Sequence, residues 1–253
     1  MTAIPDFQAA FRARAPLFGP FVRLPGHIPA ELLASVGFGC VCVDMEHAPL
    51  TRMDADLLVS TFQSHGTPVI IRPRAATPEH ILAALDAGAA GLMAPHINTG
   101  DQAQALVDAA TYQHGRGYAG ATRPAGYGAR TMADMVARQP RLVIAQVEHT
   151  DAVANIDDIL SVESIDCIFI GRSDLTLSAG VTDPDAPEVR EMLEHVTCKS
   201  IEAGRVVGTF TANLDELPSL REQGISFFLL GSDYSMLTAG GRAFKTRVES
   251  KLN

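Results

Sequence analysis

Short apolar runs alternate with segments of helical periodicity along most of this chain. Eight runs are rich in aliphatic, β-branched and aromatic residues and are bounded by turn-forming or charged residues, which is typical of strands buried on both faces. They cover residues 20–24, 41–46, 68–73, 91–97, 142–148, 167–171, 206–212 and 227–233. Because helical segments separate the runs, the sheet should be parallel. Eight such units predict an α/β fold, a closed (β/α)8 TIM barrel, as a single domain over residues 1–253.

The segments between the predicted strands carry helix signals. In residues 77–88, Thr77 can cap the helix, Pro78 suits its first turn and Gly88 can end it. Similar signatures occur in residues 101–112, 151–161, 187–204 and 214–224. An open, doubly wound sheet is the alternative architecture. It is disfavoured because no GxGxxG motif follows the first strand.

Composition and charge narrow the class of protein. The 253 residues are 47% hydrophobic and carry a formal net charge of −9, which disfavours a nucleic-acid partner because phosphate contacts need clustered Lys and Arg. No apolar stretch approaches the ~20 residues that span a bilayer, and residues 1–18 lack the apolar core of a secretory signal. We therefore expect a cytoplasmic protein that binds neither nucleic acid nor membranes. Cys40, Cys42, Cys167 and Cys198 show no paired metal spacing and are expected to be small core residues.

One glycine-rich stretch, residues 112–128, interrupts the alternation of strands and helices. It contains Arg116 and Arg123, and loops of this length in compact domains are usually functional or disordered. We expect it to lie over the mouth of the barrel, meaning the end at which the strands finish. A merely tolerated insertion is the alternative.

Polar residues follow most of the predicted strands. In a TIM barrel the carboxyl ends of the strands and the loops after them form the active face, so these side chains should converge. They are Glu46, His47, Arg72, His96, Gln146, Glu148, Asp174, Thr209 and Asp233. Any one of them alone is more often a structural residue, but their repeated placement at the same end favours a functional site.

Glu148 and Asp174 are the candidate metal ligands, because each ends an apolar strand and adjacent strands bring such carboxylates together. Two carboxylates without a cysteine cluster favour a hard divalent cation such as Mg²⁺ or Mn²⁺. The alternative is that Glu148 caps the helix beginning near Thr150 and Asp174 caps the turn before Leu175.

Asp44, His47 and Arg72 are the candidate catalytic residues. A carboxylate bonded to one imidazole nitrogen raises the basicity of the other, so Asp44 and His47 suggest an acid/base unit. Arg72 ends a predicted strand and supplies a permanent positive charge suited to a developing oxyanion. The alternative for Asp44 and His47 is a surface loop with incidental charges.

Five segments carry a resemblance to a known family. In order along the chain they read DMEHAP, IIRP, LDAGAAGLMAP, AQVE and FIGRSDL, and together they resemble the HpcH/HpaI family of metal-dependent pyruvate-type aldolases from about residue 18 to the last strand. The resemblance implies a (β/α)8 barrel whose C-terminal helix is exchanged between subunits of a hexamer.

The resemblance also implies roles for individual residues. Glu148 and Asp174 would be the metal ligands, His47 the acid/base residue supported by Asp44, and Arg72 the group beside the keto oxygen. Gln146 would lie next to the bound 2-oxoacid, the backbone of Ser173 and Asp174 would receive its carboxylate, and Asp86 would lie near the site. The chain departs from the family at Gly171-Arg172, where many members have Gly-Pro. It also departs at His96, which is similar to the macrophomate synthase branch and would contact the acceptor or a second oxygen; the alternative is a histidine that fills the barrel rim.

The lysine inventory favours metal-assisted chemistry. An aldolase needs either a lysine imine or a metal that polarises the carbonyl, and the three lysines, Lys199, Lys245 and Lys251, follow no predicted strand. We therefore expect reversible cleavage of a 4-hydroxy-2-oxoacid into a 2-oxoacid (pyruvate or hydroxypyruvate) and an aldehyde, through an enolate stabilised by Mg²⁺, Mn²⁺ or Co²⁺. The alternatives are a citrate lyase or malyl-CoA type of lyase, a sugar-phosphate enzyme using Gly208 and Gly231, and a non-catalytic barrel that binds a 2-oxoacid.

Overall fold

The computed structural model describes residues 4–137 and 142–252 and contains eight parallel strands that close into a barrel. All eight predicted strands are confirmed, with boundaries that differ by at most three residues. They are β1 (Leu17–Val22), β2 (Val41–Asp44), β3 (Val69–Arg72), β4 (Gly91–Ala94), β5 (Leu142–Val147), β6 (Cys167–Ile170), β7 (Val206–Thr211) and β8 (Phe227–Ser232). Each strand pairs with the next along the chain and β1 pairs with β8, so the predicted TIM barrel is confirmed.

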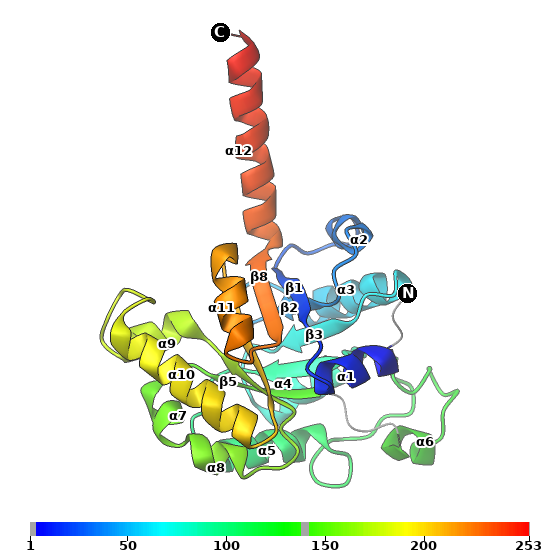
Figure 1. The fold of residues 1–253 in the computed structure, drawn as a ribbon. Coiled ribbons are helices and arrows are strands. Elements are labelled where there is room, and N and C mark those ends of the chain that lie inside the picture. Colours follow the sequence, from blue (N-terminus) through cyan, green and yellow to red (C-terminus); the bar gives the residue numbers. More distant parts are fainter. Residues whose placement is uncertain (1–3, 138–141, 253) are drawn as a thin grey trace.

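Helices surround the barrel (Figure 1). They are α1 (Ile4–Arg12), α2 (His27–Ser35), α3 (Arg52–Ser64), α4 (Pro78–Asp86), α5 (Gly100–Ala110), α6 (Met132–Ala137), α7 (Thr150–Ala154), α8 (Ile156–Leu160), α9 (Arg172–Ser178), α10 (Pro187–Glu202), the 3-10 turn η1 (Leu214–Glu216), α11 (Leu217–Glu222) and α12 (Asp233–Leu252). The start and stop signals of α4 act as predicted. The Thr77 hydroxyl accepts from the His80 amide at 3.5 Å, and Gly88 follows the helix at φ 93°.

The core has two parts, one between the sheet and the helices and one inside the barrel. The inner part includes Phe169 and Phe227, together with Phe7 and Phe11 from α1. The ring of Phe11 lies 5.1 Å from that of Phe227, so α1 packs across the end of the barrel where the strands begin. That end is thereby filled, and the opposite end remains for ligands.

Three of the four cysteines lie in this core. Cys40, Cys42 and Cys167 are fully buried, and burial raises the pKa of the Cys40 thiol to about 12. Cys198 lies exposed on α10, so the prediction of a core position is wrong for this residue.

The glycine-rich loop of residues 112–128 does not cover the mouth. It follows the end of α5 and leads toward the start of β5, so it lies at the opposite end of the barrel. Arg116 pairs with Asp86 at 3.2 Å, and Arg123 donates to the carbonyl of Ala87 at 3.0 Å, which fixes the loop against the end of α4. The expectation failed because only the loops after strands, not those after helices, reach the mouth.

The last helix, α12, extends away from the barrel over most of its length (Figure 1). Of its residues, only Asp233 is buried, while Leu237, Phe244, Val248 and Leu252 are exposed and recur on one face of the helix. Within the described residues, no helix is both long and apolar enough to cross a membrane.

Candidate functional site

A cavity of about 220 Å³ opens at the mouth of the barrel. It collects residues that are far apart in the sequence, from β1, β2, β3, β5, β6 and β7 and the loops after them. Its lining consists of Phe21, Arg23, His47, Arg72, Gln146, Phe169, Gly171, Arg172, Ser173, Asp174 and Phe210. The predicted convergence of strand-end side chains is therefore observed for His47, Arg72, Gln146 and Asp174, and Ser173 lines the cavity with them.

Asp44 is the most enclosed charged residue of this region, with no exposed side-chain surface. It pairs in register with Arg72 on the neighbouring strand, and the Arg72 Nε and Nη2 atoms lie 3.0 and 2.8 Å from its two oxygens. Arg23 donates to Asp44 Oδ2 through Nε at 2.7 Å. Burial alone would raise the pKa of Asp44, but these guanidinium groups and the His47 amide hold that pKa below its ordinary value.

The predicted contact between the Asp44 carboxylate and the His47 ring is not found among the described residues. Asp44 Oδ1 instead accepts the backbone N–H groups of Glu46 and His47, each at 3.2 Å. The His47 ring lines the cavity with about half of its surface exposed, and its Nε2 atom lies 3.8 Å from Glu46 Oε2. The Asp44 carboxylate therefore holds the backbone of the turn that carries His47, and its side-chain partners are arginines and not the His47 ring.

Arg72 is held by two carboxylates. Besides Asp44, Glu46 lies 3.1 Å from Arg72 Nη1, and the guanidinium carbon stands 4.6 Å from the centre of the Phe21 ring. Burial lowers the pKa of Arg72 and the Asp44 carboxylate raises it, so that the pKa lies above its ordinary value. Arg72 is therefore a fixed positive charge at the cavity wall.

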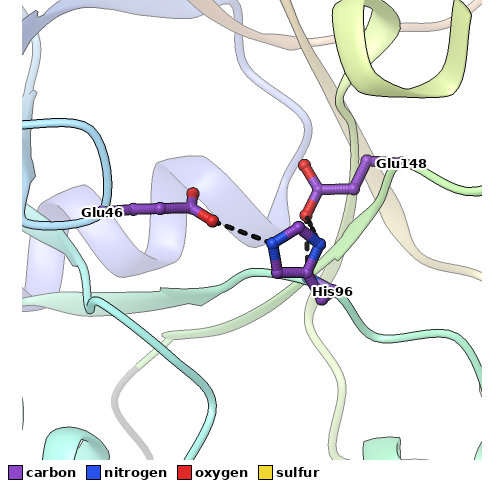
Figure 2. A group of neighbouring side chains, drawn as sticks. All are labelled: Glu46, His96 and Glu148. Atoms are coloured by element: carbon purple, nitrogen blue, oxygen red, sulfur yellow. Dashed lines mark hydrogen bonds and ion pairs between the residues drawn. The ribbon is translucent and has the colours of Figure 1, made fainter. Parts of the chain in front are cut away.

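Figure 2 shows the His96 imidazole between the carboxylates of Glu46 and Glu148. His96 Nε2 lies 3.1 Å from Glu46 Oε1, and Nδ1 lies 3.0 Å from Glu148 Oε1. The ligand atoms of the three residues all lie within 4.8 Å of one another, which is a spacing that one metal ion can bridge. His96 adopts a φ of 58°, a left-handed conformation that is uncommon outside glycine and that tends to persist at functional sites.

Glu148 is buried against several groups. Its Oε1 atom accepts the His96 backbone N–H at 2.8 Å, and its Oε2 atom accepts from the Gln146 side-chain amide. Burial raises the pKa of Glu148 above its ordinary value, and the nearby carboxylates of Glu46 and Asp174 raise it further. Gly171 is required beside it, because a Cβ at that position would stand 2.9 Å from Glu148 atoms.

Ser173 and Asp174 belong to α9 and line the same cavity. The Asp174 carboxylate is near enough to raise the pKa of Glu148, but it lies outside the close set of Glu46, His96 and Glu148. Of the predicted ligand pair, Asp174 therefore lines the mouth cavity, while Glu148 belongs to the close set beside Gln146, which lines the same cavity.

Three further predicted residues, Asp86 from the family resemblance and Asp233 and Thr209 from strand ends, have different surroundings. Asp86 ends α4 and pairs with Arg116 at the opposite end of the barrel, so within this chain it does not join the mouth cavity. Asp233 accepts the backbone N–H groups of Arg23 and Leu24, and the Thr209 hydroxyl donates to the carbonyl of Ile170 at 3.0 Å. Arg23 was not predicted as a site residue, although its position at the end of the first predicted strand was a signal for it.

Comparison with known proteins gives a consistent result. A family model described as HpcH/HpaI aldolase/citrate lyase matches residues 17–239. The chain is 33% identical over 232 residues to a hydroxypyruvate/pyruvate aldolase of Rhizorhabdus wittichii, covering 90% of this chain and 92% of the relative. It is 31% identical to a 4-hydroxy-2-oxo-heptane-1,7-dioate aldolase of Salmonella typhimurium, covering 98% and 96%. A crystal structure of an HpcH/HpaI aldolase/citrate lyase family protein from Burkholderia cenocepacia superposes with a TM-score of 0.89 at 30% identity, covering 96% of this chain and 98% of that one.

Replacing Asp44 by Asn should lower the free energy of unfolding by about 3–5 kcal/mol, because it removes the buried charge that pairs with both Arg72 and Arg23. Asp56→Asn is the matched control, since Asp56 also pairs with an arginine, Arg123, but is about half exposed. Its cost should stay below about 1 kcal/mol. Urea denaturation of both variants measures the difference, and equal costs would contradict the role assigned to Asp44.

Proposed function

This chain belongs to the HpcH/HpaI aldolase/citrate lyase family, and we propose that it cleaves 4-hydroxy-2-oxoacids reversibly into a 2-oxoacid and an aldehyde with the help of a divalent cation. It is a carbon–carbon lyase of the aldolase type. The observation that carries the proposal is the buried Glu148 beside Glu46, His96 and the fixed charge of Arg72, at the one end of the barrel that α1 does not fill.

The residues present fit a divalent cation. Two carboxylates and an imidazole offer ligand atoms within 4.8 Å, and Asp174 adds a further carboxylate near enough to raise the pKa of Glu148. Carboxylate oxygens suit Mg²⁺ or Mn²⁺, and the single nitrogen donor is compatible with Mn²⁺ or Co²⁺. Burial raises the pKa of Glu148, and a nearby positive charge would favour its ionised, ligating form.

We assign Glu148 and Asp174 as the metal ligands, in line with the family resemblance. Glu148 also belongs to the close set with Glu46 and His96, so the cation would lie against its carboxylate in either arrangement. Gln146 holds one oxygen of Glu148 and therefore orients the ligand. The other oxygen accepts the His96 amide.

The donor 2-oxoacid would bind between β5 and α9. Gln146 Oε1 is buried without a hydrogen-bond partner among the described residues, which leaves it for a substrate group. Ser173 and Asp174 line the same part of the cavity and would receive the carboxylate through their backbone. When bound, the cation supplies Lewis-acid polarisation of the keto carbonyl.

Protein side chains would then handle charge and protons. Arg72, fixed by Asp44 and Glu46, places a positive charge where negative charge develops on the keto oxygen. His47 would take the proton from the 4-hydroxyl group during cleavage, through a water, and return a proton to C3 of the 2-oxoacid. Its exposed ring at the cavity suits exchange with solvent.

The exposed face of α12 supports assembly with further copies of the chain. Leu237 and Phe244 are each 68% exposed and Leu252 is 81% exposed, on a helix that makes few contacts with its own barrel. An apolar face of this kind marks a protein interface. We propose that α12 is exchanged between subunits of a hexamer, as the family resemblance implies.

Metal removal should abolish aldolase activity, and adding back Mg²⁺, Mn²⁺ or Co²⁺ singly should restore it. Glu148→Gln and Asp174→Asn should each weaken Mn²⁺ binding at least 10-fold, because each removes a charged ligand. Calorimetric titration with Mn²⁺ and pyruvate release from a 4-hydroxy-2-oxoacid measure the two effects. Asp151→Asn, at an exposed acid three residues from Glu148, is the control and should bind Mn²⁺ normally. Full activity after thorough chelation would contradict the proposal.

His47→Asn should slow cleavage about 10²–10⁴-fold, the usual contribution of a general acid/base. It should also slow exchange of the C3 protons of pyruvate into deuterated water, which proton NMR follows. Mn²⁺ affinity should change little, because the ring is not placed among the ligands. His195→Asn on the exposed side of α10 is the control. Unchanged exchange in His47→Asn would remove this residue from the mechanism.

Phe244→Glu should reduce the size of the assembly, since it places a charge in the apolar face of α12. Ala243→Glu adds the same charge at an exposed position on another face of the helix and should leave the assembly intact. Sedimentation velocity measures the particle mass of each variant. A wild-type monomer, or the same mass for wild type and Phe244→Glu, would refute the exchange.

A further inference from the structure

Arg23 stands at the rim of the mouth cavity with much of its guanidinium unengaged. Its Nε atom donates to Asp44 Oδ2 at 2.7 Å, and its side chain is 27% exposed. Within the described residues, its two terminal nitrogens have no hydrogen-bond partner. The guanidinium carbon lies 5.4 Å from the centre of the Phe21 ring, which supports the side chain from one side. Two parallel N–H groups of this kind match the geometry of a carboxylate.

The other two arginines of the cavity are already matched by carboxylates. Arg72 contacts Asp44 and Glu46. Arg172 points to Glu216 at 2.5 Å and Asp185 at 2.7 Å, which draws it toward the loops outside the mouth. Arg23 has a single carboxylate partner, Asp44, which also pairs with Arg72. Among the cavity arginines its charge is therefore the least compensated, and it can bind an anion.

Asp44 does not depend on Arg23 for its own compensation. It keeps two bonds from Arg72 and two from the backbone amides of Glu46 and His47. A buried carboxylate with four such donors is satisfied. The fifth donor, Arg23, therefore needs a reason beyond the stability of Asp44.

The backbone of Arg23 is fixed from the other end of the chain. Its amide donates to Asp233 Oδ2 at 2.9 Å, the Leu24 amide donates to the same oxygen at 2.8 Å, and the Tyr234 hydroxyl donates to the Arg23 carbonyl at 3.2 Å. The first turn of α12 thus anchors the end of β1. Anchoring of this kind gives the side chain a defined place at the rim.

The position of Arg23 in the barrel separates it from the metal ligands. In a closed barrel ordered β1 to β8, β1 is opposite β5, and Glu148 directly follows β5. A 2-oxoacid held by Glu148, Gln146 and Asp174 would occupy the side of β5 and β6. The part of the substrate that extends away from it, toward β1, is the part that becomes the aldehyde.

We propose that Arg23 binds an anionic group on the aldehyde half of the substrate and so selects acceptors that carry a carboxylate. The assignment rests on the aldolase function proposed above, because that function defines the two halves of the substrate. Asp44 orients the guanidinium through Nε, and Nη1 and Nη2 receive the carboxylate.

The test by turnover compares succinic semialdehyde with butanal, which has the same chain length without the carboxylate, as acceptors for pyruvate with Mn²⁺ present. In wild type, kcat/KM should favour the acidic aldehyde, and Arg23→Gln should lower that preference at least 10-fold, mainly through KM. Arg23→Lys should recover part of it, because it keeps the charge but loses the fork. Arg190→Gln, on α10 outside the mouth, is the control and should keep the wild-type preference.

A binding test separates this inference from the proposed function. Calorimetry with 2-oxoheptanedioate and 2-oxoheptanoate, which lack the 4-hydroxyl and cannot be cleaved, compares a diacid with its monoacid. Tighter binding of the diacid by wild type, lost in Arg23→Gln, supports the inference even if no aldehyde is turned over, in which case only the aldolase function fails. An equal affinity of wild type for both acids, or the same preference in Arg23→Gln, overturns it.

Discussion

The mouth of this barrel depends on one buried carboxylate and the donors gathered around it. A charge as enclosed as that of Asp44 is tolerated only when it is paired and hydrogen-bonded. Arg72 and Arg23 reach it from the two neighbouring strands, and the amides of the next loop complete its coordination. The same contacts therefore tie together the ends of β1, β2 and β3 and fix the loop that carries Glu46 and His47. Arg72 and Arg23, which neutralise Asp44, also line the cavity and give its wall a positive charge.

The sequence specified the barrel far better than the contacts within its mouth. Eight apolar runs separated by helix signals have few other solutions, and the closed parallel sheet places Arg72, Gln146 and Asp174 at one end regardless of side-chain detail. The partner of Asp44 was not predictable in this way. Asp44 can pair with His47, Arg23 or Arg72, and the register of the strands, which places Arg72 beside it, decides among them. The loop of residues 112–128 was misplaced because its composition indicated function, whereas its order after a helix put it at the other end. The close approach of Glu46, His96 and Glu148 involves the left-handed backbone conformation of His96, which could not be predicted from the sequence pattern.

Strain and unmet hydrogen bonding gather at the same place. His96 is held in a left-handed conformation while its amide and ring both contact Glu148, and Gln146 keeps an unpaired oxygen beside that carboxylate. Folding alone gives no benefit for such an arrangement, because a relaxed residue at position 96 and an apolar one at position 146 would pack without these costs. Its persistence is understandable if a ligand completes it. This is independent physical support for locating the chemistry beside β5.

The filled floor of the barrel has a consequence for the order of events. Because α1 seals the end where the strands begin, both reactants have to pass through the same opening. Glu148 is almost fully enclosed, whereas Arg23 stands at the rim. If the 2-oxoacid occupies the inner position, as we propose, it has to arrive before its partner and depart after it, so the two-substrate reaction would follow a sequential and ordered mechanism. A chain with a tunnel through its axis would be free of that constraint.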